Sequence, residues 1–136
     1  MILTHAQRKF LEFHFKNPEV QAKLTDMALT MKRSNHVKQW SLWSLYGTLR
    51  FTAIAAGQGD RYQLSNNHIA YYARLIPLHE ERLAGFFNTR GKVELPEGTP
   101  NGKDIIDTNL SLARWLEGVE TAEKATGAVL PTAGNQ

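Results

Sequence analysis

Two adjacent amides, a tyrosine and an arginine follow one another in the segment SNNHIAYYAR, and together they could bind a nucleic acid. Asn66 and Asn67 would stand at the start of a helix, with Tyr71 and Arg74 in its next turns. An asparagine can read an adenine edge, helix N-terminal amides can hold a phosphate, and a tyrosine can stack on an unpaired base. The alternative is structural: the asparagines form a turn and a cap, Tyr71 packs in the core, and Arg74 forms an ion pair.

Further basic residues flank the helix that we expect at residues 41–56. Lys32, Arg33 and Lys38 precede this helix in the sequence, and Arg61 follows it. If the turns bring these side chains together, they form a patch that contacts phosphates. The alternative is that they are solvated charges at helix ends and in loops, where charged residues normally lie.

Charge is divided unevenly along the chain. Residues 1–92 hold thirteen Lys and Arg against six Asp and Glu, a net charge of +7, whereas residues 93–136 hold three against seven, a net charge of −4. A basic body with an acidic tail is typical of a protein with a polyanionic partner. The same balance also occurs in small domains whose charge only keeps them soluble, so both interpretations stay open.

No catalytic or metal-binding constellation is recognisable in the sequence. There is no cysteine, the five histidines form no HExxH or HxxxH pair, and no arrangement of paired carboxylates or of Ser, His and Asp can be traced. His14 is expected to lie at a helix end as a polar edge residue. We therefore predict no catalytic residue, no metal, no cofactor and a non-enzymatic function.

A second hypothesis is a protein-interaction module. The chain carries a surplus of aromatics, Trp40, Trp43 and Trp115, and its C-terminal part contains an amphipathic helix with an apolar stripe. Trp43, Leu112, Trp115 and Leu116 are the residues predicted to bind a host protein or a second copy.

The segment SLWSLYGTLRFTAIAA, residues 41–56, is predicted to be the central helix. One apolar stripe contains Leu42, Leu45, Tyr46, Leu49 and Ala53, and a second contains Trp43, Gly47, Arg50 and Ile54. A helix that is apolar around most of its circumference is expected to be buried on several sides. The charge of an arginine in such a helix must be paired, so Arg50 is expected to hold a carboxylate such as Asp60 or to stack on Trp43 or Tyr46.

The remaining pattern predicts a mainly α-helical fold. Thr4 and Asn17-Pro18 are start signals for the first two helices, and Pro77 is expected to end another. The order of helices around a very short β element is compatible with a helix-turn-helix or winged-helix relative. The expected helices cover residues 4–16, 18–33, 41–56 and 68–76, a short helical pattern covers 78–87, and residues 61–64 are extended.

The chain is predicted to divide into a basic helical domain (1–92), a Pro/Gly linker (93–102), an acidic amphipathic helix (103–125) and a flexible tail (126–136). No apolar run reaches the roughly 20 residues that a membrane span requires. The N-terminus lacks the pattern of a signal peptide. We therefore expect a cytoplasmic protein that has no membrane partner.

Residues 1–92 contain three further motifs: Arg50-Phe51, the Asn66-Asn67 and Tyr71-Tyr72-Ala73-Arg74 run, and Gly85-Phe86-Phe87 with Arg90. Through these motifs, residues 1–92 resemble a group of small uncharacterised proteins of bacterial genomes, phages and prophages. The resemblance implies a phage or prophage origin, the cytoplasm of a bacterial host cell and a domain limit near residue 92, but no mechanism. The leading prediction is thus a phage-type, DNA-binding protein. The alternative is a module that inhibits a host factor or takes part in virion assembly.

Overall fold

The computed structural model describes residues 1–35, 37–63, 66–89 and 93–129. Its elements confirm the predicted mainly α-helical fold, and within these ranges the β structure is one isolated parallel bridge between Trp40 and Phe87. Arg61 and Tyr62 lie in a turn rather than in the expected extended element, and residue 64 lies outside the described ranges. The elements are α1 (His5–Lys16), α2 (Glu19–Asn35), α3 (Leu42–Ala55), α4 (Asn66–His79), the 3-10 helix η1 (Glu81–Leu83), α5 (Gly102–Thr108) and α6 (Leu112–Val129).

The first two helices begin and end close to their predicted positions. Thr4 and Gln7 form a capping box at the start of α1, in which each side chain accepts the backbone N–H of the other residue. Asn17 was expected to cap α2, but its side-chain amide donates to the Phe13 carbonyl at 3.2 Å. Asn17 therefore closes α1, because its amide satisfies one of the carbonyls that a helix end leaves without a partner.

The most buried helix is α4, not the helix predicted to be central. Tyr72, Leu75 and Ile76 have no exposed surface, because α1, α2, α3 and η1 all pack around α4. α3 buries only the stripe of Leu42, Leu45, Tyr46, Leu49 and Ala53. The prediction that residues 41–56 are buried on several sides is therefore wrong for the second stripe.

Pro77 lies inside α4, which continues to His79 instead of ending at the proline. Proline lacks the N–H that would reach back four residues, but it does not prevent later residues from bonding. The N–H of Glu80 donates to the Ile76 carbonyl at 2.9 Å, so the last turn is closed after the proline.

The expected single helix at residues 103–125 is divided into α5 and α6. Asn109 adopts the left-handed conformation, with φ of 51° and ψ of 45°, and so ends α5. Ser111 then starts α6, where its hydroxyl accepts the N–H of Arg114 at 3.1 Å. α6 extends to Val129, beyond the predicted start of the tail at residue 126, and residues 130–136 lie outside the described part of the chain.

α5 packs closely on the turn between α1 and α2. The N–H of Gly102 donates to Oε1 of Gln21 at 2.7 Å, and a Cβ at position 102 would lie 2.2 Å from the Pro18 carbonyl oxygen. Only glycine fits this approach without displacing backbone. Pro96 and Thr99, in the segment predicted as a linker, are buried. The limits of the predicted domains stay a prediction.

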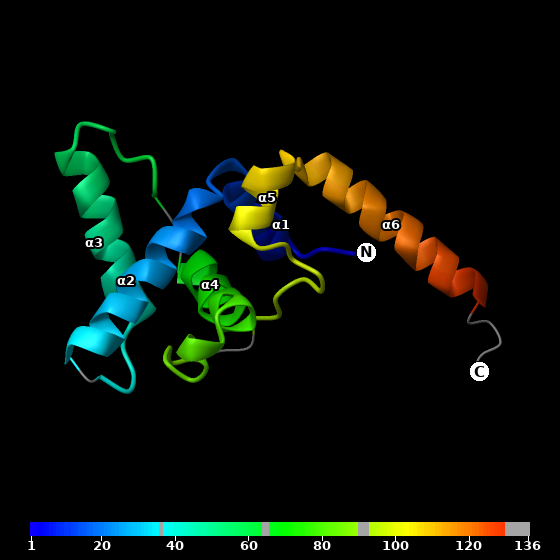
Figure 1. The fold of residues 1–136 in the computed structure, drawn as a ribbon. Coiled ribbons are helices and arrows are strands. Elements are labelled where there is room, and N and C mark those ends of the chain that lie inside the picture. Colours follow the sequence, from blue (N-terminus) through cyan, green and yellow to red (C-terminus); the bar gives the residue numbers. More distant parts are fainter. Residues whose placement is uncertain (36, 64–65, 90–92, 130–136) are drawn as a thin grey trace.

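α3 and α6 extend from opposite sides of the group formed by α1, α2, α4 and α5 (Figure 1). α6 contacts α1, and the Trp115 ring lies 5.9 Å from the Phe15 ring. α3 is held by α2 and α4. The far end of α3 and the turn that follows it stand clear of the other helices in this view.

Candidate functional site

The residues predicted to contact a nucleic acid do not form one surface. Tyr71 is only 2% exposed, and its ring stacks on Phe10 with a centroid distance of 4.9 Å. Tyr71 is therefore not placed to stack on a base, and the structural alternative describes it better. Asn67 is exposed in the first turn of α4, and the side chain of Asn66 lies outside the described part of the structure.

The basic residues around α3 lie near opposite ends of α2. Lys32 lies in the last turn of α2, and its Nζ donates to the carbonyl of Arg82 in η1. Arg33 and Lys38, close to Lys32 in the sequence, are exposed. Arg61 instead pairs with Glu19, the first residue of α2, at 3.3 Å. Lys32 lies thirteen positions after Glu19 in the same helix, which corresponds to a rise of about 20 Å. The structure thus does not bring Arg61 together with the other three.

Most of the residues proposed to bind a partner contribute to packing within the chain. Leu112 and Trp115 pack against the core cluster while partly exposed, and Leu116 is half-buried. Trp43 differs from these, because its side chain is 54% exposed. Among the predicted partner-binding residues, Trp43 is the one that the fold leaves most accessible.

The exposed side of α3 gathers several large apolar side chains on one stripe. Trp43, Phe51 and Ile54 are 54%, 71% and 47% exposed, and Gly47 and Arg50 lie between them along the helix. At 3.6 residues per turn, the five positions fall within an arc of about 100° and extend over about 16 Å. We call this surface the α3 face: Trp43, Gly47, Arg50, Phe51 and Ile54.

The pairing of Arg50 with Asp60 confirms the expected charge partner. Nε of Arg50 donates to Oδ1 of Asp60 at 2.6 Å, and a second guanidinium nitrogen bonds the other carboxylate oxygen. Gly57 and Gly59, with φ of 80° and 71°, turn the chain back so that Asp60 reaches the helix. The hydrogen bonds from Arg50 hold the pKa of Asp60 below its usual value. The single charge on the α3 face is therefore neutralised within the chain.

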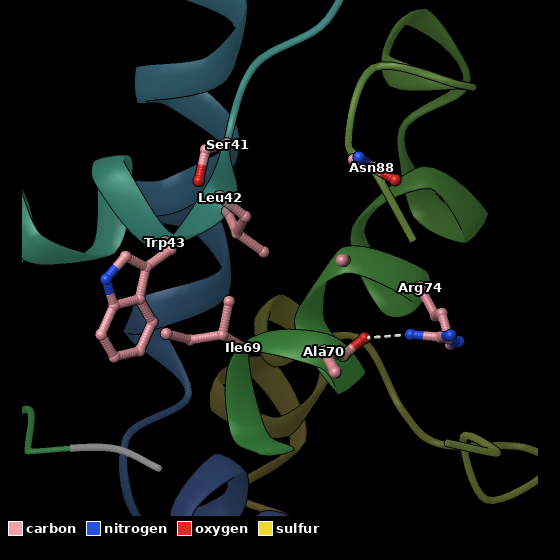
Figure 2. Close-up of a pocket in the computed structure, with 8 residues that line it drawn as sticks. Ser41, Leu42, Trp43, Ile69, Ala70, Arg74 and Asn88 are labelled. Carbon is pink, nitrogen blue, oxygen red and sulfur yellow. Dashed lines mark hydrogen bonds between the residues drawn. The ribbon is translucent and has the colours of Figure 1, made fainter. Parts of the chain in front are cut away.

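A cavity of about 380 Å³ adjoins the N-terminal end of the α3 face. Figure 2 shows Trp43 at one edge, Arg74 and Asn88 at the opposite edge, and Leu42 and Ile69 between them. Arg74 donates to the Ala70 carbonyl at 2.8 Å, which fixes its side chain along α4. The lining residues are Ser41, Leu42, Trp43, Ile69, Ala70, Ala73, Arg74 and Asn88.

His14 is buried, and not a polar edge residue as expected from the sequence. Its Nε2 lies 2.8 Å from the Pro100 carbonyl oxygen and its Nδ1 lies 3.0 Å from the Tyr72 hydroxyl. The carbonyl can only accept, so Nε2 carries the proton and the neutral ring accepts the Tyr72 hydroxyl at Nδ1. Burial lowers the pKa of His14 to about 4, although the bond to Pro100 favours the charged form.

This histidine has a structural role that the sequence did not reveal. Its ring stacks on Phe10 at a centroid distance of 5.5 Å and joins α1, α4 and the segment before α5. The one available signal was the aromatic spacing of Phe10, Phe13 and His14 with their neighbours, which did not distinguish an inward from an outward histidine. His14 has both ring nitrogens engaged and is sealed from solvent, so it is not a candidate for catalysis.

The described ranges contain no group of three or more His, Cys, Asp and Glu that could hold a metal ion. None of the helices in these ranges combines the length and the apolar character needed to span a membrane. No family model, no curated protein and no solved structure matches this chain. Functional inference therefore depends on the α3 face and the adjoining cavity.

Proposed function

We propose that this protein is a non-enzymatic protein-interaction module that binds a partner protein through the α3 face. The observation that supports it is the exposure of Trp43, Phe51 and Ile54 on one stripe of a single helix. Isolated exposed apolar residues are common on protein surfaces, whereas large contiguous ones are typical of interaction sites.

Trp43, Phe51 and Ile54 belong neither to the core cluster nor to the side chains packed against it. Leu45, Tyr46 and Leu49 hold α3 against the core from the other side. Fully burying a side chain such as Phe or Ile stabilises a complex by roughly 1.5–3 kcal/mol. Three such anchors could therefore supply several kcal/mol to binding, before the costs of association are subtracted.

The composition of the α3 face also suits a protein partner. Tryptophan and arginine are enriched among the residues that dominate binding energy in protein interfaces. Here Trp43 and Arg50 lie one above the other along the stripe, and Asp60 already neutralises Arg50. A partner surface would therefore meet an apolar face without an uncompensated charge, which favours apolar contact over phosphate binding.

The resemblance of residues 1–92 to phage and prophage proteins supports a phage or prophage origin. It also supports a partner inside a bacterial host cell, either a host factor or a component of virion assembly. Neither the origin nor the partner follows from the helical fold, which hosts many unrelated functions.

DNA binding is the second candidate, and the +7 charge of residues 1–92 favours it. Arg33 is exposed in the last turn of α2 and Lys38 in the segment after it, where a phosphate backbone could approach them. Binding of this kind would weaken steeply with added salt, because cations are released from the nucleic acid. Contact through the apolar α3 face would persist, since burial of apolar surface is not screened.

The test is capture of partners by the immobilised full-length protein from a bacterial lysate treated with nuclease, in about 0.5 M NaCl. Phe51→Asp is expected to abolish a specific capture. Ile106→Asp, which alters an exposed apolar residue of α5 outside the α3 face, is the matched control and should retain it. Equal capture by the wild type and the Phe51→Asp variant would contradict the proposal.

A parallel measurement separates the second candidate. Fluorescence anisotropy with labelled single- and double-stranded DNA, repeated across a salt series, measures phosphate contact directly. Salt-sensitive binding that the Arg33→Ala and Lys38→Ala variants weaken, together with no capture at high salt, would favour DNA binding over the α3 face.

A further inference from the structure

The cavity beside Trp43 combines an apolar floor with a cation at its edge. Leu42, Ile69 and Ala73 are buried side chains that supply the apolar surface. Arg74 and Asn88 both lie on the side opposite Trp43, apart from one another (Figure 2). A site of this kind suits a ligand that carries an apolar group and a negative charge close together.

The charge of the lining residues is one-sided. Arg74 is the charged residue among the eight that line the cavity, and none of the eight is acidic. Its guanidinium is planar and can bond a carboxylate through two parallel N–H groups. A carboxylate is therefore matched here in both charge and hydrogen bonding, whereas a cationic ligand is not.

The volume sets the size of the ligand. About 380 Å³ is near the lower end of the roughly 300–1,000 Å³ that small-ligand sites occupy. The cavity can therefore hold one apolar residue with its carboxylate, but not a long helical segment. Trp43 belongs to both the cavity and the α3 face, so a group bound here lies next to a protein seated on that face.

We propose that this cavity binds the C-terminal residue of the partner, an apolar residue whose free carboxylate pairs with Arg74. The apolar side chain lies against Leu42, Ile69 and Ala73, and the indole of Trp43 covers it from the side. The inference rests on the proposed function, because the rest of the partner then continues along the α3 face. It adds to that function the chemistry by which the partner is recognised.

The test uses a peptide probe and the full-length protein. The pentapeptide acetyl-Gly-Ser-Gly-Ser-Leu is titrated with a free C-terminus, and then as its C-terminal amide, while ¹H–¹⁵N spectra are recorded. The free acid is expected to shift the amide signals of residues 41–43, 69–74 and 88, and the amide to bind about tenfold more weakly, since it lacks the charge. Equal binding of both forms, or no shifts from either, would overturn the proposal.

Variants assign the interaction to the cavity. Arg74→Gln is expected to lower the affinity about tenfold, whereas Arg82→Gln, at an exposed arginine of η1, should leave it unchanged. Ala70→Leu should abolish binding, because it fills the cavity without touching the charge of Arg74. Melting curves identify a variant that has unfolded. Retained binding by a folded Ala70→Leu variant would place the site elsewhere and overturn the proposal.

A third probe distinguishes a peptide terminus from a free carboxylic acid. N-acetyl-leucine carries the same apolar group and carboxylate without a peptide before it. Weaker binding than the pentapeptide supports the peptide terminus, and equal or tighter binding assigns the site to a small carboxylic acid and overturns the peptide source.

The Phe51→Asp variant separates this inference from the proposed function, because Phe51 does not line the cavity. It should still bind the pentapeptide while losing capture of the partner. If the wild type captures a partner but does not bind the pentapeptide, the proposed function stands and the cavity inference is overturned. If the wild type binds the pentapeptide but captures no partner, the cavity is supported as a carboxylate site and the proposed function is overturned.

Discussion

Replacing His14 by phenylalanine should lower the stability of the fold at neutral pH and make it less sensitive to acid. The neutral His14 ring bonds both the Tyr72 hydroxyl and the Pro100 carbonyl inside the core. Phenylalanine keeps the stacking on Phe10 but leaves the buried Tyr72 hydroxyl and the half-buried Pro100 carbonyl without this partner. Each such group costs about 1–3 kcal/mol. At pH 7 the variant should therefore unfold at a clearly lower denaturant concentration than the wild type.

The pH dependence follows from the sign of the shift. The pKa of His14 is lowered from 6.5 to about 4 in the folded state, so between these values the unfolded chain binds a proton that the native protein does not. The contribution of His14 is thus fully present above pH 6.5 and is lost as the pH falls toward 4. For these two pKa values, lowering the pH from 7 to 5 reduces the free energy of unfolding of the wild type by about 2 kcal/mol.

The assay is urea unfolding at pH 7, 6 and 5, followed by tryptophan fluorescence and circular dichroism. The difference between the wild type and the His14→Phe variant should shrink by roughly 2 kcal/mol over this range. His5→Gln is the matched control, because His5 is exposed at the start of α1. Burial also lowers the pKa of His68, and both proteins keep that contribution. Parallel stability curves for the wild type and the His14→Phe variant would refute the reasoning.

Two further pairs of variants test the packing. Gly102→Ala should destabilise the fold by about 1–3 kcal/mol, because its Cβ would lie 2.2 Å from the Pro18 carbonyl oxygen. A Cβ added at Gly118 would have no atom within 4 Å apart from the backbone of its own helix. Gly118→Ala should therefore stabilise α6 by up to about 1 kcal/mol in thermal melts. The Tyr46 hydroxyl is buried without a hydrogen-bond partner in the described residues. Tyr46→Phe is therefore expected to be neutral or stabilising, whereas Tyr72→Phe leaves Nδ1 of His14 without a partner and should cost about 1–3 kcal/mol. A destabilised Gly118→Ala variant, or equal effects at the two tyrosines, would contradict these expectations.

Helices with strong local start signals could be predicted from the sequence almost to the residue. Thr4 caps α1 and Ser41 caps α3, since each side chain accepts a backbone N–H three residues later. Such bonds depend on residues that are close in the chain, so the sequence carries the information. Arg50 and Asp60 were paired correctly for a related reason: only a short turn separates them.

The features that the sequence missed depend on contacts between distant segments. The Nε2 of His14 bonds a residue 86 positions away, and Gly102 approaches the Pro18 carbonyl from another helix. Neither partner can be identified from periodicity, because helical spacing shows which residues share a face but not what covers it. The same reason explains why the end of α5 at Asn109 was missed, since the apolar pattern on both sides of it predicts one continuous helix. For the same reason the sequence could not show that Arg61 pairs with Glu19 at the start of α2, thirteen positions before Lys32.

The error over α3 is itself informative about function. A helix with two apolar stripes is expected to be buried on both, and the chain covers only the stripe that contains Leu45 and Leu49. The hydrophobic effect does not distinguish a neighbour in the same chain from a partner, since both remove the same apolar surface from water. A sequence pattern that demands more burial than one chain provides is therefore consistent with burial supplied on binding. Trp43 and Phe51 satisfy this pattern on the exposed side of α3, and for that reason the partner is expected there and not at the dispersed basic residues.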